Sequence, residues 1–128
     1  MGTKYLLDSN VIIGYLDNKI TQSGITFVSA VINKVPNVSV ISKIEVLRFN
    51  TTETVTEVLR SFFNYAVVYQ LDNSVVEKTI DICRNHRIKL PDAIIAATCI
   101  INNFVLLTRN VADFKNIENL KIINPWEL

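Results

Sequence analysis

Short apolar runs alternate along the chain with longer segments of helical periodicity, and this alternation limits the possible folds more than any other feature. The first run, residues 4–7, ends at Asp8 and is followed by a helical pattern from Val11 to Leu16. Strands that alternate with helices pair mostly in parallel, because each helix returns the chain to the same end of the sheet. The sequence therefore predicts an α/β fold with a mostly parallel central sheet of about five strands, covered by helices on both faces.

Individual elements can be placed from the same pattern. Strands are expected at residues 4–7, 38–41, 66–69, 104–107 and 121–123, and helices at 42–49, 53–64, 73–83, from 91 to 101 and, as a single turn, at 110–114. Residues 24–33 predict only a weak helix, since their β-branched side chains also suit a strand. The helix that begins at Pro91 is apolar on all sides, which predicts that it is buried.

Composition narrows the class of protein further. A chain of 128 residues can enclose one hydrophobic core, so residues 1–128 are expected to form a single domain. The net charge of +1 provides no global positive field, and nucleic-acid binding would need a local patch.

Cys83 and Cys99 lack the spacing of a zinc site and are expected in the core. The first apolar run is too short for a signal peptide or a membrane span, so a cytoplasmic location is expected.

Four acidic residues are the main candidates for a functional site: Asp8, Glu45, Asp92 and Asp113. Asp8 follows the first predicted strand, and Glu45 and Asp113 lie about one turn beyond the second and fourth, while Asp92 opens the apolar helix. The carboxyl ends of parallel strands meet at one edge of the sheet, so the carboxylate oxygens are expected to approach a common point. Two carboxylates about 4 Å apart repel by roughly 4 kcal/mol at an effective dielectric near 20. Such a cluster needs cations, and hard oxygen ligands without His or Cys suit Mg²⁺ or Mn²⁺.

Each acid also has a purely local explanation. Asp8 can cap the first helix, residues 42–45 fit a capping box, and residues 110–113 fit a similar cap. Asp92 in a first turn complements the helix dipole. Taken singly, the acids are better explained as caps; a common meeting point at one edge of the sheet would favour the functional interpretation.

Four segments carry a resemblance to the PIN-domain family of ribonucleases. Residues 6–12 (LLDSNVI) resemble the opening motif, 41–47 (ISKIEVL) the second, 90–97 (LPDAIIAA) the third, and 107–114 (LTRNVADF) the closing motif. All four acidic positions of the family pattern are filled, in order. The size and motifs are most similar to VapC-type toxins, the nuclease halves of toxin–antitoxin pairs. Ser9 stands where Thr is commoner, and residues 50–65 carry no family motif.

This resemblance implies a Mg²⁺- or Mn²⁺-dependent endoribonuclease. Asp8, Glu45 and Asp92 would hold one ion, and Asp113 would complete the site or help to hold a second ion. Water activated by the metal would attack an RNA phosphodiester in line and leave a 5′-phosphate and a 3′-hydroxyl. The resemblance further implies a homodimer and a cognate antitoxin, whose C-terminal segment binds across the active-site groove.

Polar residues next to the acids are candidates for supporting roles. Ser9, Thr108 and Asn110 would orient carboxylates, water or phosphate through hydrogen bonds. As an equal alternative, they serve only as turn and cap residues. His86 is the only histidine, which excludes a ribonuclease mechanism that depends on a pair of histidines.

A short basic run precedes Asp92. Its cations Arg84, Arg87 and Lys89 would supply the local positive patch that RNA binding requires. Cations at the end of a helix also complement its dipole, so both interpretations stay open.

Other functions fit parts of the sequence. A phosphatase of the haloacid dehalogenase type also places an Asp after the first strand, but it needs a second Asp where this chain has Asn10. A catalytically inert PIN-like module that binds RNA or a partner would usually have lost one or more of the acids. A PIN nuclease of RNA processing also remains open, and a small antitoxin-like gene immediately upstream would favour the toxin.

Overall fold

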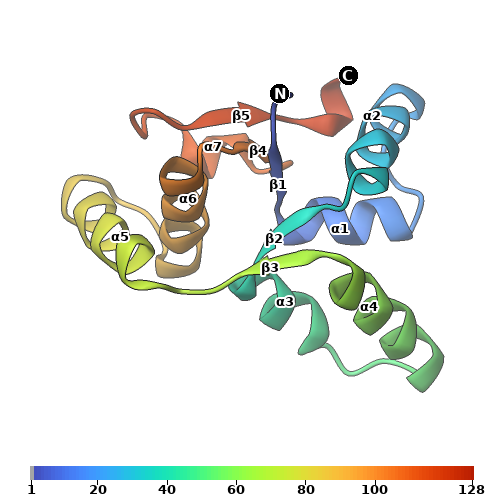
Figure 1. Ribbon diagram of the computed structural model, residues 1–128. Coiled ribbons are helices and arrows are strands. Elements are labelled where there is room, and N and C mark those ends of the chain that lie inside the picture. Colours follow the sequence, from blue (N-terminus) through green and yellow to red (C-terminus); the bar gives the residue numbers. More distant parts are fainter. Residues whose placement is uncertain (1) are drawn as a thin grey trace.

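The computed structural model describes residues 2–128, which form a five-stranded sheet between two groups of helices (Figure 1). The strands are β1 (Tyr5–Leu7), β2 (Asn37–Ser39), β3 (Val67–Tyr69), β4 (Val105–Leu107) and β5 (Lys121–Ile123). All neighbouring strands pair in parallel, in the order β3-β2-β1-β4-β5. The predicted α/β fold with a parallel sheet is confirmed.

Seven α-helices connect the strands: α1 (Ser9–Leu16), α2 (Gln22–Asn33), α3 (Val40–Leu47), α4 (Glu53–Tyr65), α5 (Asn73–Asn85), α6 (Leu90–Asn102) and α7 (Val111–Phe114), and a 3₁₀ turn, η1 (Pro125–Glu127), follows β5. Several begin at a capping side chain. Thr21 accepts a hydrogen bond from the N–H of Gly24, and Asp72 accepts one from the N–H of Val75. The weak pattern of residues 24–33 is therefore resolved as a helix, which begins two residues earlier than that segment.

Strand β1 lies at the centre of the sheet. The chain proceeds outward from it through β2 to β3, then returns to the opposite side of β1 with β4 and β5. At such a reversal, open α/β sheets form a crevice beyond the carboxyl ends of the two strands, here β1 and β4, and bind ligands there. Leu7 and Leu107 are paired in register, so Asp8 and Thr108 leave the sheet at the same level.

Two apolar cores lie on opposite faces of the sheet, because successive side chains of a strand alternate between the faces. Leu6 belongs to the core beneath α5 and α6, whereas Leu7 belongs to the core beneath α1, α2 and α4. Residues 93–99 of α6 are all buried, as its apolar pattern predicts. The two cores hold β1 rigidly, and with it the start of α1.

The boundary between β2 and α3 differs from the prediction. The strand ends at Ser39 rather than at residue 41, because the Ser39 hydroxyl accepts a hydrogen bond from the N–H of Ile41 and caps the helix. Ser42 therefore lies inside α3, and the capping box over residues 42–45 was wrong. The Ser42 hydroxyl is buried and has no hydrogen-bond partner among residues 2–128.

The two cysteines are placed differently from each other. Cys99 is buried in α6, as expected, but Cys83 is exposed on α5, and its prediction as a core residue was wrong. Helix α5 turns Val75, Thr79 and Ile82 toward the core, and position 83 lies beyond this stripe. None of the helices within residues 2–128 is long and apolar enough to cross a membrane.

Candidate functional site

Asp8 is held at the centre of the crevice. It is buried, caps α1 and accepts a hydrogen bond of 2.8 Å from the N–H of Ser9 through Oδ1. Its Oδ2 accepts a bond of 2.9 Å from the Thr108 hydroxyl and one of 3.2 Å from the Asn10 amide. Asp8 is thus a helix cap and a member of the cluster at once, so the two interpretations of this residue are compatible.

Asn10 links the two sides of the crevice. Its Nδ2 donates to Asp8 and, at 3.3 Å, to the Thr108 hydroxyl, while its Oδ1 accepts a bond of 3.0 Å from the N–H of Arg109. Asn10 was not among the polar residues predicted to support the acids. Its position two residues after the first acid, in the turn that begins α1, was the available signal.

Glu45 reaches the site from α3. The Ser9 hydroxyl donates a bond of 3.2 Å to its Oε1 and so connects the starts of α1 and α3. The Glu45 side chain is half-buried, and its Oε2 has no hydrogen-bond partner in the described part of the chain. That oxygen is available to water or a cation.

Asp92, in the first turn of α6, interacts electrostatically with the other three acids. Partial burial is the largest of the causes that raise the pKa of Asp92 from 3.8 to about 6, followed by repulsion from Asp8, Asp113 and Glu45. Lys89 acts in the opposite direction. Burial also raises the pKa of Asp8, against the hydrogen bonds that stabilise its charged form, and Asp113 adds to the increase. The four acids therefore share one electrostatic environment at the carboxyl edge of the sheet.

The carboxylates approach one another less closely than expected. Within residues 2–128, no three Asp, Glu, His or Cys side chains are arranged so that they could hold a metal ion together. Like charges repel, which favours separated carboxylates. Four carboxylates with no imidazole or thiolate among them are nevertheless the donors that Mg²⁺ or Mn²⁺ prefers.

Asn110 and Asp113 follow β4, although not as the cap that residues 110–113 suggested. Asp113 lies in the first turn of α7 and is exposed, and the Asn110 side chain makes no capping hydrogen bond within the described residues. Instead, the N–H of Asn110 donates a bond of 3.1 Å to the Thr108 hydroxyl.

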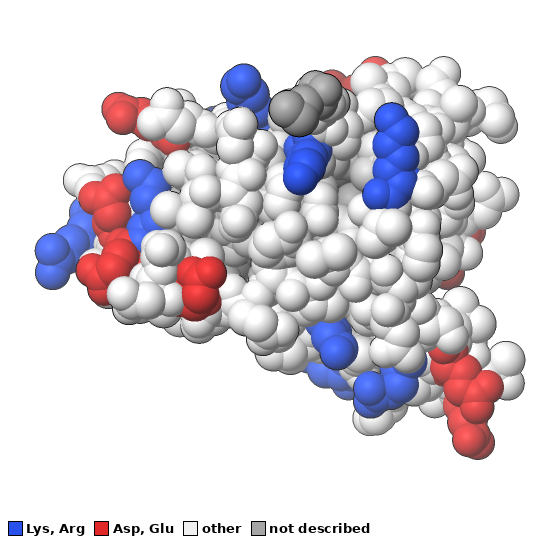
Figure 2. Space-filling view, viewed as in Figure 1, with Lys and Arg blue, Asp and Glu red and all other residues white. Residues whose placement is uncertain are grey.

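The three predicted RNA-binding cations are spread over a helix end and a loop. Arg84 lies in the last turn of α5, Arg87 is exposed in the loop that follows, and Lys89 is the residue at which α6 begins. Of these, Lys89 acts electrostatically on Asp92. Figure 2 shows the Lys and Arg side chains of one face scattered over the surface, some of them beside Asp and Glu, rather than gathered in one large patch.

The chain belongs to the PIN-domain family. The family model, described as PIN domain, matches residues 5–120 and so includes all four acids. Among curated proteins, none matches the sequence significantly.

Solved structures share the fold over nearly the whole chain. A toxin–antitoxin complex from Klebsiella pneumoniae has a TM-score of 0.77 at 23% identity, with 98% of this chain and 100% of that chain covered. DNA-bound VapBC from Salmonella typhimurium has a TM-score of 0.80 at 20% identity, covering 97% and 99%. VapBC-1 from nontypeable Haemophilus influenzae has a TM-score of 0.78 at 21% identity, covering 98% and 100%. The resemblance to the PIN-domain family is therefore confirmed, and the chain shares its fold with these toxin–antitoxin and VapBC structures.

Proposed function

We propose that this PIN domain is a Mg²⁺- or Mn²⁺-dependent endoribonuclease and the toxin of a toxin–antitoxin pair. The observation that carries the catalytic part is that burial, and after it repulsion from Asp8, Asp113 and Glu45, raises the pKa of Asp92 to about 6. Acids that only cap unrelated, distant helices would not raise one another's pKa in this way. Membership of the PIN family supports the same assignment.

The residues of the site suggest a division of labour. Asp8, Glu45 and Asp92 would hold the cation, with Asp113 completing the set. A bound divalent cation lowers the pKa of coordinated water and neutralises charge on the phosphate. Ser9 and Thr108 each fix one carboxylate through a hydroxyl, so the ligand oxygens are oriented before the substrate arrives. The free Oε2 of Glu45 can accept a hydrogen bond from the attacking water.

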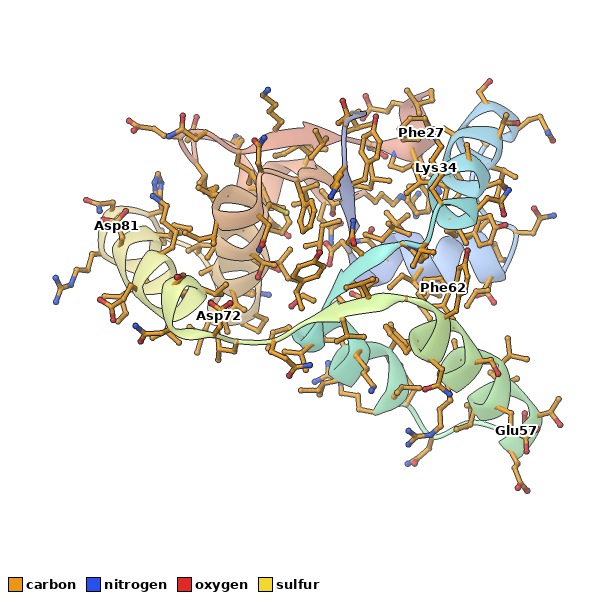
Figure 3. All side chains as sticks on the ribbon, in the orientation of Figure 1. Phe27, Lys34, Glu57, Phe62, Asp72 and Asp81 are labelled. Atoms are coloured by element: carbon orange, nitrogen blue, oxygen red, sulfur yellow. The ribbon has the colours of Figure 1, made fainter. Side chains whose placement is uncertain are left out.

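Cleavage of single-stranded RNA tests the proposal. The wild-type protein is expected to cut RNA in Mg²⁺ or Mn²⁺ and not in EDTA, while Asp8→Asn and Asp92→Asn lower the rate at least about a hundredfold. Asp81→Asn is the matched control, because Asp81 lies on the outside of α5 (Figure 3). Equal cleavage rates in wild type and Asp92→Asn would contradict the catalytic role of Asp92. No cleavage by the wild-type protein in Mg²⁺ or Mn²⁺ would favour an inert, partner-binding module.

Metal binding needs a measurement that does not depend on activity. Isothermal titration with Mn²⁺ is expected to show binding to the wild-type protein and a large loss of affinity in Glu45→Gln. Glu57→Gln provides the control, since Glu57 is exposed on α4, away from the crevice (Figure 3). If Glu45→Gln binds Mn²⁺ as tightly as the wild-type protein does, while the wild type cuts RNA, Glu45 is not a ligand of the ion.

An apolar groove supports the antitoxin partner. It has a volume of about 510 Å³, lies between α1, α3 and α4, and is lined by Ile13, Leu16, Phe49, Val55 and Val58, among others. Phe49 is 65% exposed and Val58 52%. Exposed apolar side chains in one groove suit an apolar segment of a partner protein. A solved structure that shares this fold is a toxin–antitoxin complex from Klebsiella pneumoniae.

Growth of a bacterial host tests the toxin role. Expression of the protein is expected to arrest growth, and co-expression of the small protein encoded immediately upstream should restore it. Phe49→Glu and Val58→Glu should leave RNA cleavage intact but abolish this rescue. If the upstream frame encodes no such protein, and growth continues in spite of cleavage, a role in RNA processing is favoured. The homodimer is tested separately by light scattering.

A further inference from the structure

Arg109 carries a positive charge next to the acidic site without neutralising any of its acids. Its guanidinium carbon lies 4.9 Å from the centre of the Trp126 ring, over the face of that ring. In the described chain, the one ion pair joins Lys78 to Asp81 on α5, so no carboxylate pairs with Arg109. A guanidinium that lies over an aromatic ring keeps the N–H groups along its edge free to bind an anion.

The backbone of Arg109 is fixed to the site. Its N–H donates a hydrogen bond of 3.0 Å to Asn10 Oδ1, and the Asn10 amide in turn donates to Asp8. The preceding residue, Thr108, also bonds directly to Asp8. The hydrogen bonds of the acidic site therefore fix the position of the backbone from which the Arg109 side chain extends.

Trp126 is a rigid support for this guanidinium. Its indole N–H donates a bond of 3.1 Å to the Lys19 carbonyl, and its backbone N–H donates one of 2.9 Å to Asn124 Oδ1. The ring also packs against Gly14 of α1, where a Cβ atom would come within 2.6 Å of the ring carbon Cζ2. The turn that carries Trp126 lies beside α2, near the label C in Figure 1.

We propose that Arg109, held in place by Trp126, binds an RNA phosphate adjacent to the phosphodiester that is cut. The inference rests on the proposed nuclease function. The planar guanidinium can donate two parallel N–H bonds to phosphate oxygens. The ring that holds it packs on α1 rather than among the acids, so the phosphate bound is a neighbouring one. Arg109 then contributes to substrate binding, not to the chemical step.

Binding of a fluorescein-labelled, single-stranded RNA tests the assignment. Anisotropy is measured in EDTA, which prevents cleavage, over a series of KCl concentrations. Arg109→Met is expected to raise Kd about tenfold and to reduce the slope of log Kd against log salt by about 0.7, the value for one lost phosphate contact on a single strand. In Mg²⁺, KM for cleavage should rise while kcat changes by less than about twofold.

Three further variants separate this role from a structural one. Arg109→Lys restores the charge and should recover the salt slope and part of the affinity. Trp126→Leu keeps Arg109 but removes its support, so it should also weaken RNA binding. Lys34→Met is the control. Lys34 follows the last residue of α2 (Figure 3) and, with Tyr5, lines a hollow at the amino end of the sheet, so its loss should change neither Kd nor slope.

The outcomes distinguish the two proposals. If Arg109→Met matches Lys34→Met in Kd, salt slope and KM, the role of Arg109 is wrong and the nuclease proposal stands. If the wild-type protein neither binds nor cuts RNA, the nuclease proposal fails, and the role of Arg109 fails with it.

Discussion

The hydroxyl of Thr108 donates a hydrogen bond of 2.9 Å to Oδ2 of Asp8, across the crevice between the ends of β4 and β1. Thr108 has no exposed surface, and Asp8 is 4% exposed, so the bond is shielded from solvent. Thr108 also accepts bonds from the N–H of Asn110 and the amide of Asn10. One hydroxyl thereby joins the segment that follows β1 to the segment that follows β4.

Thr108→Val should lower both the stability of the protein and its rate of RNA cleavage, because it removes this hydroxyl. Valine has nearly the same shape but leaves buried polar groups unpaired, so we expect a loss of about 1–3 kcal/mol in the free energy of unfolding and slower RNA cleavage. Urea unfolding and an RNA cleavage assay measure the two effects. Thr108→Ser retains the hydroxyl and should recover most of both. Similar behaviour of the two variants would mean that the hydrogen bonds contribute little.

Asp92→Asn should make the protein more stable at neutral pH without metal. The pKa of Asp92 is raised from 3.8 to about 6 on folding, so the folded state binds the proton more tightly than the unfolded state. Protonation therefore stabilises the fold: this contribution is complete below pH 3.8 and is lost as the pH rises to about 6. The neutral Asn avoids that loss.

Thermal unfolding in EDTA between pH 3.5 and 8 tests this prediction, with the pH range chosen to span roughly two units above and below the raised pKa. Tm of the wild type should fall more steeply than Tm of Asp92→Asn over the lower half of the range. Asp81→Asn, which alters a surface ion pair on α5, should follow the wild type. Parallel curves for wild type and Asp92→Asn would show that the acids do not act on one another as described.

Two serines near the start of α3 should respond in opposite ways to replacement by alanine. Ser39→Ala removes the cap of α3 and should destabilise the protein by about 1 kcal/mol. Ser42→Ala removes a buried hydroxyl that lacks a partner within residues 2–128, and stability should stay the same or increase. Urea unfolding of both variants decides between Ser39 and Ser42 as the cap: a larger loss for Ser42→Ala would restore the predicted capping box.

Gly24→Ala should disturb the packing of η1 on α2. A Cβ atom at residue 24 would collide with the backbone carbonyl of Pro125, and such overpacking costs about 1–3 kcal/mol. Trp126 is the only tryptophan, so its fluorescence reports the displacement directly. Gly2→Ala is the control, because nothing lies within 4 Å of the added atom. Unchanged Tm and emission in Gly24→Ala would contradict the close packing.

The sequence predicted the order and direction of the elements because both follow from local patterns. Apolar runs marked the five strands, and their alternation with helices indicated parallel pairing. The same reasoning placed Asp8, Glu45 and Asp113 beyond strand ends. It failed at the start of α3, where Val40 and Ile41 suit strand and helix equally and the Ser39 hydroxyl decides between them. It failed again at Cys83, where a small change in helical phase separates core from surface.

Contacts between distant segments were beyond the reach of pattern analysis. Arg109 and Trp126 are brought together only because β5 and η1 return the chain to α1 and α2. The role of Asn10 depends on β4 lying beside β1, which its own neighbours in sequence do not reveal. The separation of the four carboxylates likewise depends on side-chain positions that spacing cannot predict.

The central position of β1 has a consequence for a newly made chain. Until β4 has been synthesised and inserted, one edge of β1 is bare, and Asp8 lacks the hydroxyl supplied from 100 residues further along. During synthesis, the first acid of the cluster is therefore present long before the complete acidic site can form. If the protein is a toxin, the chain is inactive during most of its synthesis, and a partner protein can be synthesised in that time.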